Sequence, residues 1–148
     1  MTRVAVSACL LGRNCRWDGG NNACEQVIAL SKRPDIEIIE VCPEVSGGLG
    51  IPRPPAEIRD GRVINSRGED VTGSFEKGAR ACLARVLDTG CACAVLKARS
   101  PSCGCSTVYD GTFSHTLVSG DGLFSALLRE HKIPVCDEEH IGASGVLR

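Results

Sequence analysis

The stretch Cys91-Ala-Cys-Ala-Val-Leu96-Lys-Ala-Arg-Ser100-Pro-Ser-Cys103-Gly-Cys105 changes character halfway along its length. Its first six residues are small or apolar and predict a buried strand. Pro101 prevents the strand from continuing, because proline has no amide hydrogen to donate to a neighbouring strand. The loop beyond offers the thiol of Cys103, followed by Gly104, whose missing Cβ lets another group approach the backbone. On this stretch alone the loop is either part of a binding site or a tight turn with an incidental cysteine.

Two other apolar segments lead directly into a thiol. Residues 3–8 end at Cys9, and the isoleucine-rich residues 35–41 end at Cys42. Apolar residues at helical spacing separate these segments, and such alternation predicts a parallel sheet with right-handed crossovers and helices on both faces. Ligands of such sheets bind beyond the carboxyl ends of the strands, where the strand order reverses. We therefore expect Cys9, Cys42 and Cys103 to converge at one edge of the sheet.

The helices are expected at three places. The first begins near Asn22, with Glu25 three residues on as an approximate capping box, and ends before Pro34. The second runs from residue 72 or 74 to about 88, and the third covers about 121–131.

The expected fold class is α/β, with a small, open, mostly parallel sheet in a Rossmann-like three-layer arrangement and two β-hairpin excursions. The hairpins are predicted over residues 57–64 and 106–118, turning at Asp60-Gly61 and at Asp110-Gly111. A short strand over 133–136 contains a proline and is expected at the sheet edge. All of residues 1–148 are expected to form a single domain, with a loosely ordered tail from Ile141 to Arg148.

Charge and hydropathy narrow the classes of partner. The net charge is −1, with both signs interspersed, so neither a polyanion nor a membrane surface is indicated. No apolar run approaches the roughly 20 residues of a membrane span, and no signal-peptide pattern is present, so we expect a cytoplasmic protein. With one Trp and one Tyr, the chain also offers little for stacking the bases of a long nucleic acid.

Cysteine is strongly enriched, with ten in the chain. Without an export signal these thiols are expected to be reduced, which leaves metal ligation, catalysis or apolar packing as their roles. Thiolates suit zinc, copper(I) or an iron–sulfur cluster, although the spacings match neither ferredoxins nor zinc fingers. A structural zinc would need a fourth ligand, such as Cys15 or Cys105. A cubane cluster on three thiolates would instead leave one iron open as a Lewis acid.

The remaining cysteines carry less definite expectations. Cys91 and Cys93 are expected on the same face of a strand, either as a ligand pair or as buried thiols. Core positions on helices are expected for Cys24 and Cys82. Cys15 and Cys105 could form a disulfide, bind a second metal or have no role, and the role of Cys136, at the end of the fourth strand, stays open.

Polar residues near the three strand-end thiols are candidates for chemistry. Glu44 follows Cys42 closely and is either a general acid or base, with its pKa raised by burial, or a solvated or helix-capping group. Ser100 and Ser102 either donate hydrogen bonds to a ligand or cap their turn.

Two charged residues are further candidates for substrate binding. Asp18 and Arg53 are expected either to line the pocket or to pair with each other. A Cys–His nucleophile pair gains little support, because the histidines lie away from these loops in the sequence: His115, His131 and His140.

Several short motifs, taken in order, resemble those of one family. They are Ser7-Ala-Cys9-Leu-Leu-Gly12, Trp17-Asp18-Gly19, Cys42-Pro-Glu44, Pro52-Arg53-Pro54, Gly68-Glu-Asp70-Val-Thr72, Ser100-Pro-Ser-Cys103-Gly104 and Tyr109-Asp110-Gly111. Over nearly its whole length the chain is similar to the DUF523 family, which includes the thiouracil desulfidases. Departures are mild, with Trp17 where tyrosine is common and Cys15 where an apolar residue is common.

This resemblance implies a [4Fe-4S] cluster held by Cys9, Cys42 and Cys103, with one iron not ligated by protein. It implies that Glu44 and Ser100 act at the substrate, a thiolated base or nucleoside of the 2-thiouracil kind. The product would be the oxo base with hydrogen sulfide, without a net redox step. The alternatives are a structural zinc protein, or a sulfide or persulfide carrier that turns over no thiolated base. The natural substrate and the oligomeric state stay open.

Overall fold

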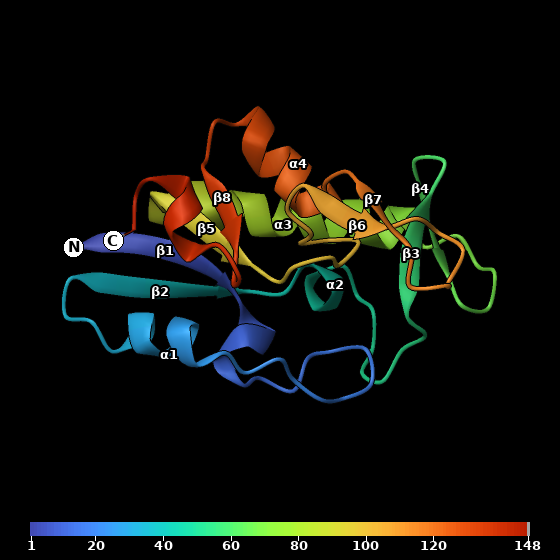
Figure 1. The fold of residues 1–148 in the computed structure, drawn as a ribbon, viewed down its shortest axis with the longest axis horizontal. Coiled ribbons are helices and arrows are strands. Elements are labelled where there is room, and N and C mark those ends of the chain that lie inside the picture. Colours follow the sequence, from blue (N-terminus) through green and yellow to red (C-terminus); the bar gives the residue numbers. More distant parts are fainter. Residues whose placement is uncertain (148) are drawn as a thin grey trace.

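The computed structural model describes residues 1–147 and contains one four-stranded parallel sheet (Figure 1). Its strand order is β2-β1-β5-β8, and all three neighbouring pairs are parallel. β2 lies on one side of β1, and β5, the next strand of this sheet along the chain, lies on the other side. The strand order therefore reverses between β1 and β5. The expected open parallel sheet is confirmed, with these strand bounds: β1 Thr2–Ser7, β2 Ile36–Val41, β5 Cys93–Leu96 and β8 Val135–Asp137.

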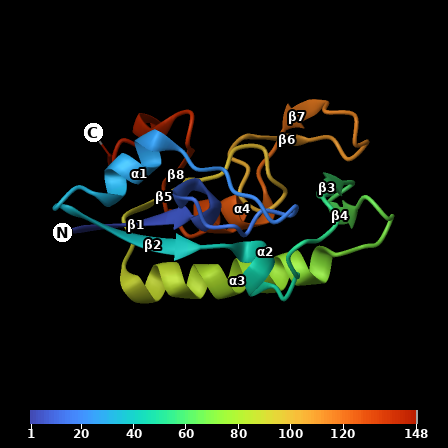
Figure 2. The ribbon, with the colours of Figure 1, turned by 90° about the horizontal axis from the view of Figure 1, so that it is seen from below.

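Helices cover both faces of the sheet, as expected for three layers. One face carries α3 (Thr72–Thr89) and α4 (Leu123–Glu130), and the other carries α1 (Glu25–Ser31). Figure 2 shows α3 along one side of the sheet and α1 on the opposite side. Two 3₁₀ turns, η1 (Ala8–Leu11) and η2 (Ile141–Ser144), pack on the α1 face through the second core cluster.

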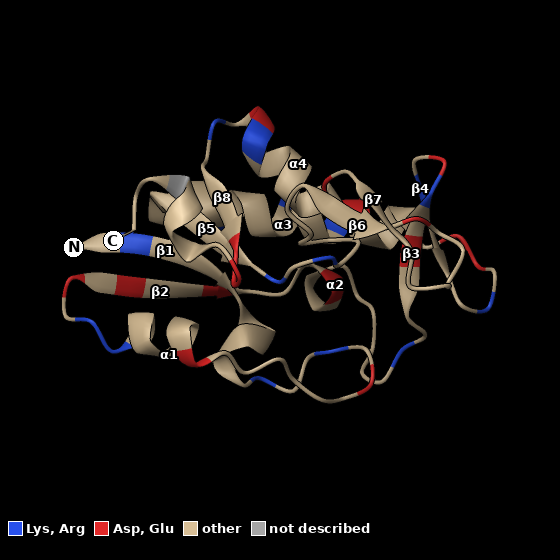
Figure 3. Ribbon diagram, in the orientation of Figure 1, with Lys and Arg blue, Asp and Glu red and all other residues tan. Residues whose placement is uncertain are grey.

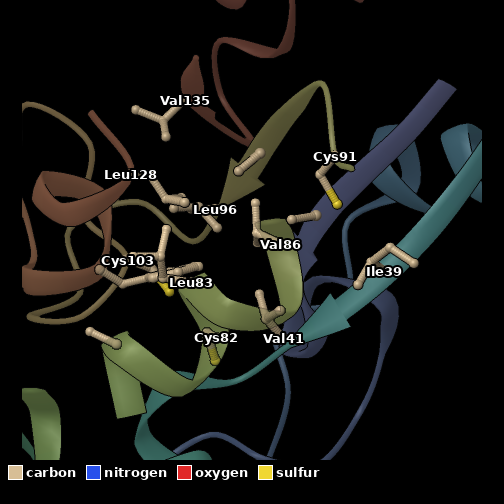
Figure 4. Close-up of a cluster of buried hydrophobic side chains, with 14 residues drawn as sticks. Ile39, Val41, Cys82, Leu83, Val86, Cys91, Leu96, Cys103, Leu128 and Val135 are labelled. Atoms are coloured by element: carbon tan, nitrogen blue, oxygen red, sulfur yellow. The ribbon is translucent and has the colours of Figure 1, made fainter. Parts of the chain in front are cut away.

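The core consists of two apolar clusters, one on each face, because successive strand residues point to opposite sides. In β1, Ala5 belongs to the cluster beneath α3 and α4, whereas Val4 and Val6 belong to the α1 cluster. Figure 4 shows the first cluster, in which Leu96 and Cys103 take part. Fully burying a valine or leucine contributes about 1.5–3 kcal/mol, so these layers hold the strand ends in place.

Two antiparallel hairpins extend beyond the carboxyl ends of the strands (Figure 1). The first pairs β3 (Ala56–Arg59) with β4 (Arg62–Asn65) and turns at Asp60-Gly61, as predicted. Both turn residues have positive φ, 50° and 75°, as a type I′ hairpin requires.

The second hairpin pairs β6 (Thr107–Tyr109) with β7 (Leu117–Ser119), and the prediction of its turn was wrong. The chain continues as a wide loop to residue 116, because the first hairpin holds it open. Glu57 Oε1 accepts hydrogen bonds from the amides of Gly111 and Phe113, both at 3.1 Å. Gly111 lies against β3, where a Cβ would come within 2.7 Å of the Arg59 side chain.

A one-turn helix, α2 (Pro43–Ser46), rests directly on the backbone of α3. A Cβ on Gly78 would lie 1.7 Å from the Pro43 carbonyl oxygen, and one on Gly47 would lie 2.0 Å from that of Ser74. This glycine contact determines the position of α2, and with it the positions of Cys42 and Glu44.

The start of α1 differs from the prediction. The helix begins at Glu25, after a Cys24 N-cap without a side-chain capping bond. Backbone hydrogen bonds from Asn22 to Cys9 and from Cys24 to Leu10 hold this segment extended against η1. The proposed capping box therefore does not form.

Cys91 and Cys93 do not share a face, contrary to the prediction. Strand β5 begins only at Cys93, and Gly90 with φ of 69° turns the chain just before Cys91. As a result, Cys91 lies in the α3 cluster and Cys93 in the α1 cluster.

The C-terminal tail is more ordered than expected. It forms η2, and Leu147 is 5% exposed in the α1 cluster. Arg148, which the prediction included, lies outside the described residues. No helix in the described part of the chain is long and apolar enough to cross a membrane.

Candidate metal and substrate site

A cavity of about 650 Å³ opens beyond the carboxyl ends of the parallel strands. The loops after β1, β2 and β5 bring one thiol each to its wall: Cys9, Cys42 and Cys103. This is the edge at which the strand pattern predicts that they converge. The polar residues singled out from the sequence also line the cavity, and they are Asp18, Glu44, Arg53, Ser100 and Ser102.

Cys103 is the most enclosed of the three thiols, with 4% of its surface exposed. Burial raises its pKa to about 12, although hydrogen bonds from Ser7 and Ser102 oppose this shift. The Ser7 hydroxyl donates to Cys103 Sγ at 3.3 Å and accepts the Lys97 amide at 2.9 Å. Ser7 thereby joins the end of β1 to the loop after β5. Sequence reasoning gave Ser7 no role of its own, although it stands at a strand end and opens the motif Ser7-Ala-Cys9.

Cys9 and Cys42 are half-buried and share a third neighbour, Cys15. Hydrogen bonding with the Cys15 thiol lowers the pKa of Cys42 to about 7, aided by the Val45 amide and opposed by burial. The same thiol is the largest cause that lowers the pKa of Cys9, and the pKa of Cys15 is raised in turn. A fourth thiol therefore stands beside two of the three strand-end thiols.

Glu44 and Arg53 form an ion pair inside the cavity, with 3.1 Å between Oε1 and Nε. The other carboxylate oxygen accepts the Ser102 hydroxyl at 2.9 Å. Arg53 also donates from Nη2 to the Cys15 carbonyl at 2.8 Å and from Nη1 to that of Gly50 at 3.2 Å. One guanidinium thus orients the carboxylate and secures two loops.

Asp18 and Arg53 do not pair with each other, which resolves an alternative left open by the sequence. The carboxylate of Asp18 binds Arg16 through both oxygens, at 2.6 and 2.7 Å, and accepts the Gly20 amide. Its oxygens therefore already have protein partners, and they stabilise the loop at the rim.

The two serines divide the functions that the sequence left open. Ser100 Oγ accepts the Cys103 amide at 2.7 Å and so caps the turn that carries this thiol. Ser102, which is 2% exposed, instead reaches Glu44. The hydroxyls lie 3.2 Å apart, so Ser100 still lies at the edge of the Glu44 network.

Aromatic side chains form another part of the cavity wall. Tyr109, Phe113 and His115 come from the second hairpin, and Trp17 from the loop after η1. Tyr109 and His115 meet edge to face, with ring centroids 6.1 Å apart. His115 lies far from the thiol-bearing loops in the sequence, and the wide hairpin loop brings it to the cavity wall. No local pattern predicts that approach.

The chemistry of the donor set fits an iron–sulfur cluster. In the part of the chain that the structure describes, no three Cys, His, Asp or Glu side chains are grouped to hold one metal ion. The three strand-end thiols surround a space instead, and thiolates are the ligands that iron–sulfur clusters take. The Ser7 hydroxyl on Cys103 supplies the kind of hydrogen bond to sulfur that tunes such clusters.

Fold and site together define a three-layer α/β protein with a thiol-lined cavity at the strand-order reversal. The family model described as 2-thiouracil desulfurase matches residues 4–140, and the chain belongs to this family.

Two relatives place the chain within the family. It is 34% identical to the uncharacterized protein YbbK of Bacillus subtilis (strain 168), over 93% of this chain and 97% of that protein. It is also similar to a solved structure, that of the [4Fe-4S]-dependent thiouracil desulfidase TudS (DUF523Vcz). The TM-score is 0.91 at 38% identity, covering 99% of this chain and 97% of that one.

Proposed function

We propose that this protein is a [4Fe-4S]-dependent desulfidase that converts a small thiolated pyrimidine into its oxo counterpart and hydrogen sulfide. Membership of the 2-thiouracil desulfurase family and the likeness to TudS support this activity. The observation that carries the proposal is the meeting of three strand-end thiols with the Glu44 carboxylate in one cavity.

Cys9, Cys42 and Cys103 are the proposed ligands of the cluster. Three protein ligands leave one of the four irons without a protein donor. When bound, the cluster supplies a thiophilic Lewis acid that polarises the carbon–sulfur bond. Ser7 and Ser100 hold the loop of Cys103, through its sulfur and its amide respectively.

Glu44 is the proposed general acid or base. Arg53 and Ser102 each hold one of its oxygens, so the carboxylate has a defined orientation toward the cavity. There it can take a proton from the attacking water or return one to a ring nitrogen. Water supplies the new carbonyl oxygen and two protons, and sulfur leaves as hydrogen sulfide, so electrons balance without an oxidant. Arg53 acts in this scheme through Glu44.

The proposed substrate is a thiolated nucleobase or nucleoside. Trp17, Tyr109 and Phe113 offer apolar rings at the cavity wall, where a flat heterocycle can pack. Ser100 and Asp18 are the proposed contacts to the polar edge of the bound heterocycle. Lys and Arg are interspersed with Asp and Glu over the ribbon in Figure 3, which argues against a long nucleic acid as substrate. We also propose a cytoplasmic location, because cysteines that form no disulfide among the described residues are typical of a reducing compartment.

Anaerobic purification tests the proposal. We expect a brown protein with about four irons and four sulfides, as its cluster formula requires, that releases sulfide from 2-thiouracil. Cys103→Ala should lose iron and activity, whereas Cys24→Ser, a half-buried cysteine outside the cavity, should retain both. Zinc without iron would overturn the proposal in favour of a structural zinc protein. A brown protein that binds sulfide without turning over any thiolated base would instead be a carrier.

A further inference from the structure

Lys97 is a cation on the cavity wall, and none of the roles above uses its side chain. The ammonium forms an ion pair with Glu138, with 3.0 Å between Nζ and Oε2, and the two side chains are 20% and 13% exposed. Glu138 follows β8 and is not among the described residues that line the cavity. The pair therefore presents its cation, rather than its carboxylate, to the cavity.

Hydrogen bonds hold the backbone at Lys97 in place. Its own amide donates to Ser7 Oγ at 2.9 Å, and the amide of Ala98 donates to Glu138 Oε1 at 2.7 Å. One carboxylate thus binds both the ammonium and the backbone just beyond β5. Since Ser7 also donates to Cys103 Sγ, Lys97 is fixed beside the loop that carries this proposed cluster ligand.

The Lys97 ammonium has three N–H donors and two hydrogen-bond partners in the described part of the chain. The partners are Glu138 Oε2, at 3.0 Å, and the Ala98 carbonyl oxygen, at 3.1 Å. One donor therefore stays available to a molecule in the cavity. An acceptor atom on that molecule would form a charge-assisted hydrogen bond, which is stronger than one between neutral groups.

Among the lysines and arginines of the cavity wall, Lys97 has the donor that a ligand can use most readily. All three side-chain nitrogens of Arg53 and of Arg16 already donate to protein oxygens. Arg99 pairs with Glu139 and is more exposed than Lys97, so water competes more strongly for its donors.

We propose that Lys97 is a specificity-determining residue, whose ammonium donates a hydrogen bond to the unreacting carbonyl oxygen of a thiolated uracil. The proposal rests on the proposed function, and it narrows the substrate class to pyrimidines that carry a carbonyl group beside the thiocarbonyl. A site built to bind a substrate oxygen rejects an analogue without it, because the polar group of the protein is then left unpaired.

The test compares kcat/KM for 2-thiouracil with kcat/KM for pyrimidine-2-thione, which lacks the carbonyl group, in the anaerobically purified holoprotein. Comparison of this ratio between variants cancels the different intrinsic reactivities of the two compounds. In Lys97→Met the ratio should fall about ten- to hundredfold, the effect of losing a hydrogen bond from a charged group. Lys77→Met removes an exposed lysine of α3 outside the cavity and should leave both rates unchanged.

Product binding gives a second readout. By calorimetry, Lys97→Met should bind uracil about ten- to hundredfold more weakly than the wild type, with little change for pyrimidin-2-one. A merely structural role of Lys97 would weaken the binding of both compounds alike.

Further variants separate the contact with substrate from the ion pair, because Lys97→Met leaves Glu138 without its counter-charge. Glu138→Gln breaks the ion pair but keeps the ammonium and an acceptor for the Ala98 amide, so its kcat/KM ratio should stay near that of the wild type. The double variant Lys97→Met with Glu138→Gln leaves neither charge unpaired, and it should show the same low ratio as Lys97→Met.

Each outcome has a separate meaning. A wild-type ratio in Lys97→Met or in the double variant would overturn the role of Lys97 and leave the desulfidase assignment intact. An equally low ratio in Glu138→Gln would overturn it too, because the ion pair rather than the free donor would then be the cause. A wild-type protein that releases no sulfide from 2-thiouracil would overturn the proposed function itself.

Discussion

The carboxylate of Glu44 is bound to the guanidinium of Arg53 within the cavity, where the two side chains are only 18% and 7% exposed. This pair differs from the arginine–carboxylate pairs at the protein surface, such as Arg3 with Glu37, whose side chains are 51% and 45% exposed. Removal of one partner from an enclosed pair leaves a charge without compensation, whereas water replaces a lost partner at the surface.

Arg53→Met should therefore destabilise the protein by about 3 kcal/mol or more and lower kcat, because Glu44 loses both its counter-charge and its orientation. Arg3→Met is the matched control and should cost less than about 1 kcal/mol, with no effect on kcat. Urea denaturation and steady-state kinetics measure the two effects. Equal stability losses in the two variants would show that the Glu44 pair is no stronger than a surface pair.

Ser102→Ala should lower kcat by about ten- to hundredfold with the cluster retained, since the lost hydrogen bond is to a charged oxygen and is worth about 1.5–3 kcal/mol. Ser100→Ala should act differently, because it removes the acceptor of the Cys103 amide, and we expect reduced iron content. Iron analysis beside kinetics distinguishes the two. If Ser102→Ala lost iron and Ser100→Ala did not, the roles assigned to the two serines would be reversed.

Gly78→Ala should unfold the protein at lower urea and reduce iron content, because the new methyl group would collide with the Pro43 carbonyl and displace α2. Such overpacking costs typically 1–3 kcal/mol. Gly73→Ala lies on the same helix with open space around it, and it should be neutral or stabilise by up to about 1 kcal/mol. A Gly78→Ala protein as stable as Gly73→Ala would contradict the contact between α2 and α3.

Asp70→Asn should destabilise the protein near neutral pH and lose that effect in acid. Hydrogen bonds from Thr72, with help from Arg62, lower the pKa of Asp70 from 3.8 to about 2 in the folded protein. A lowered carboxyl pKa stabilises the folded state above the unfolded pKa, and the contribution is lost as pH falls from about 4 toward 2. Urea midpoints of both proteins across this range measure it. A difference that stays constant with pH would exclude the charge of Asp70 as its source.

Much of the fold was predictable because its signals are local. Apolar runs, helical spacing and Pro101 predict strands and helices, and their alternation predicts the parallel sheet. The rule for ligands of such sheets then brings Cys9, Cys42 and Cys103 together. Two of the predictions that failed, those of the second hairpin turn and of Cys91, lie where contacts from distant segments or a turn just before a strand altered the local pattern.

By itself, the sequence determined which strands end in thiols, because strand ends follow from the order of apolar and turn-forming residues along the chain. Only the tertiary structure decided that Arg53 binds Glu44 rather than Asp18, and that Cys15 lines the same cavity as Cys9 and Cys42. It also decided that His115 reaches the cavity. The physical reason is that these contacts depend on the paths of loops. A loop path is determined by backbone packing between remote segments, such as Gly78 on Pro43, which no periodicity records.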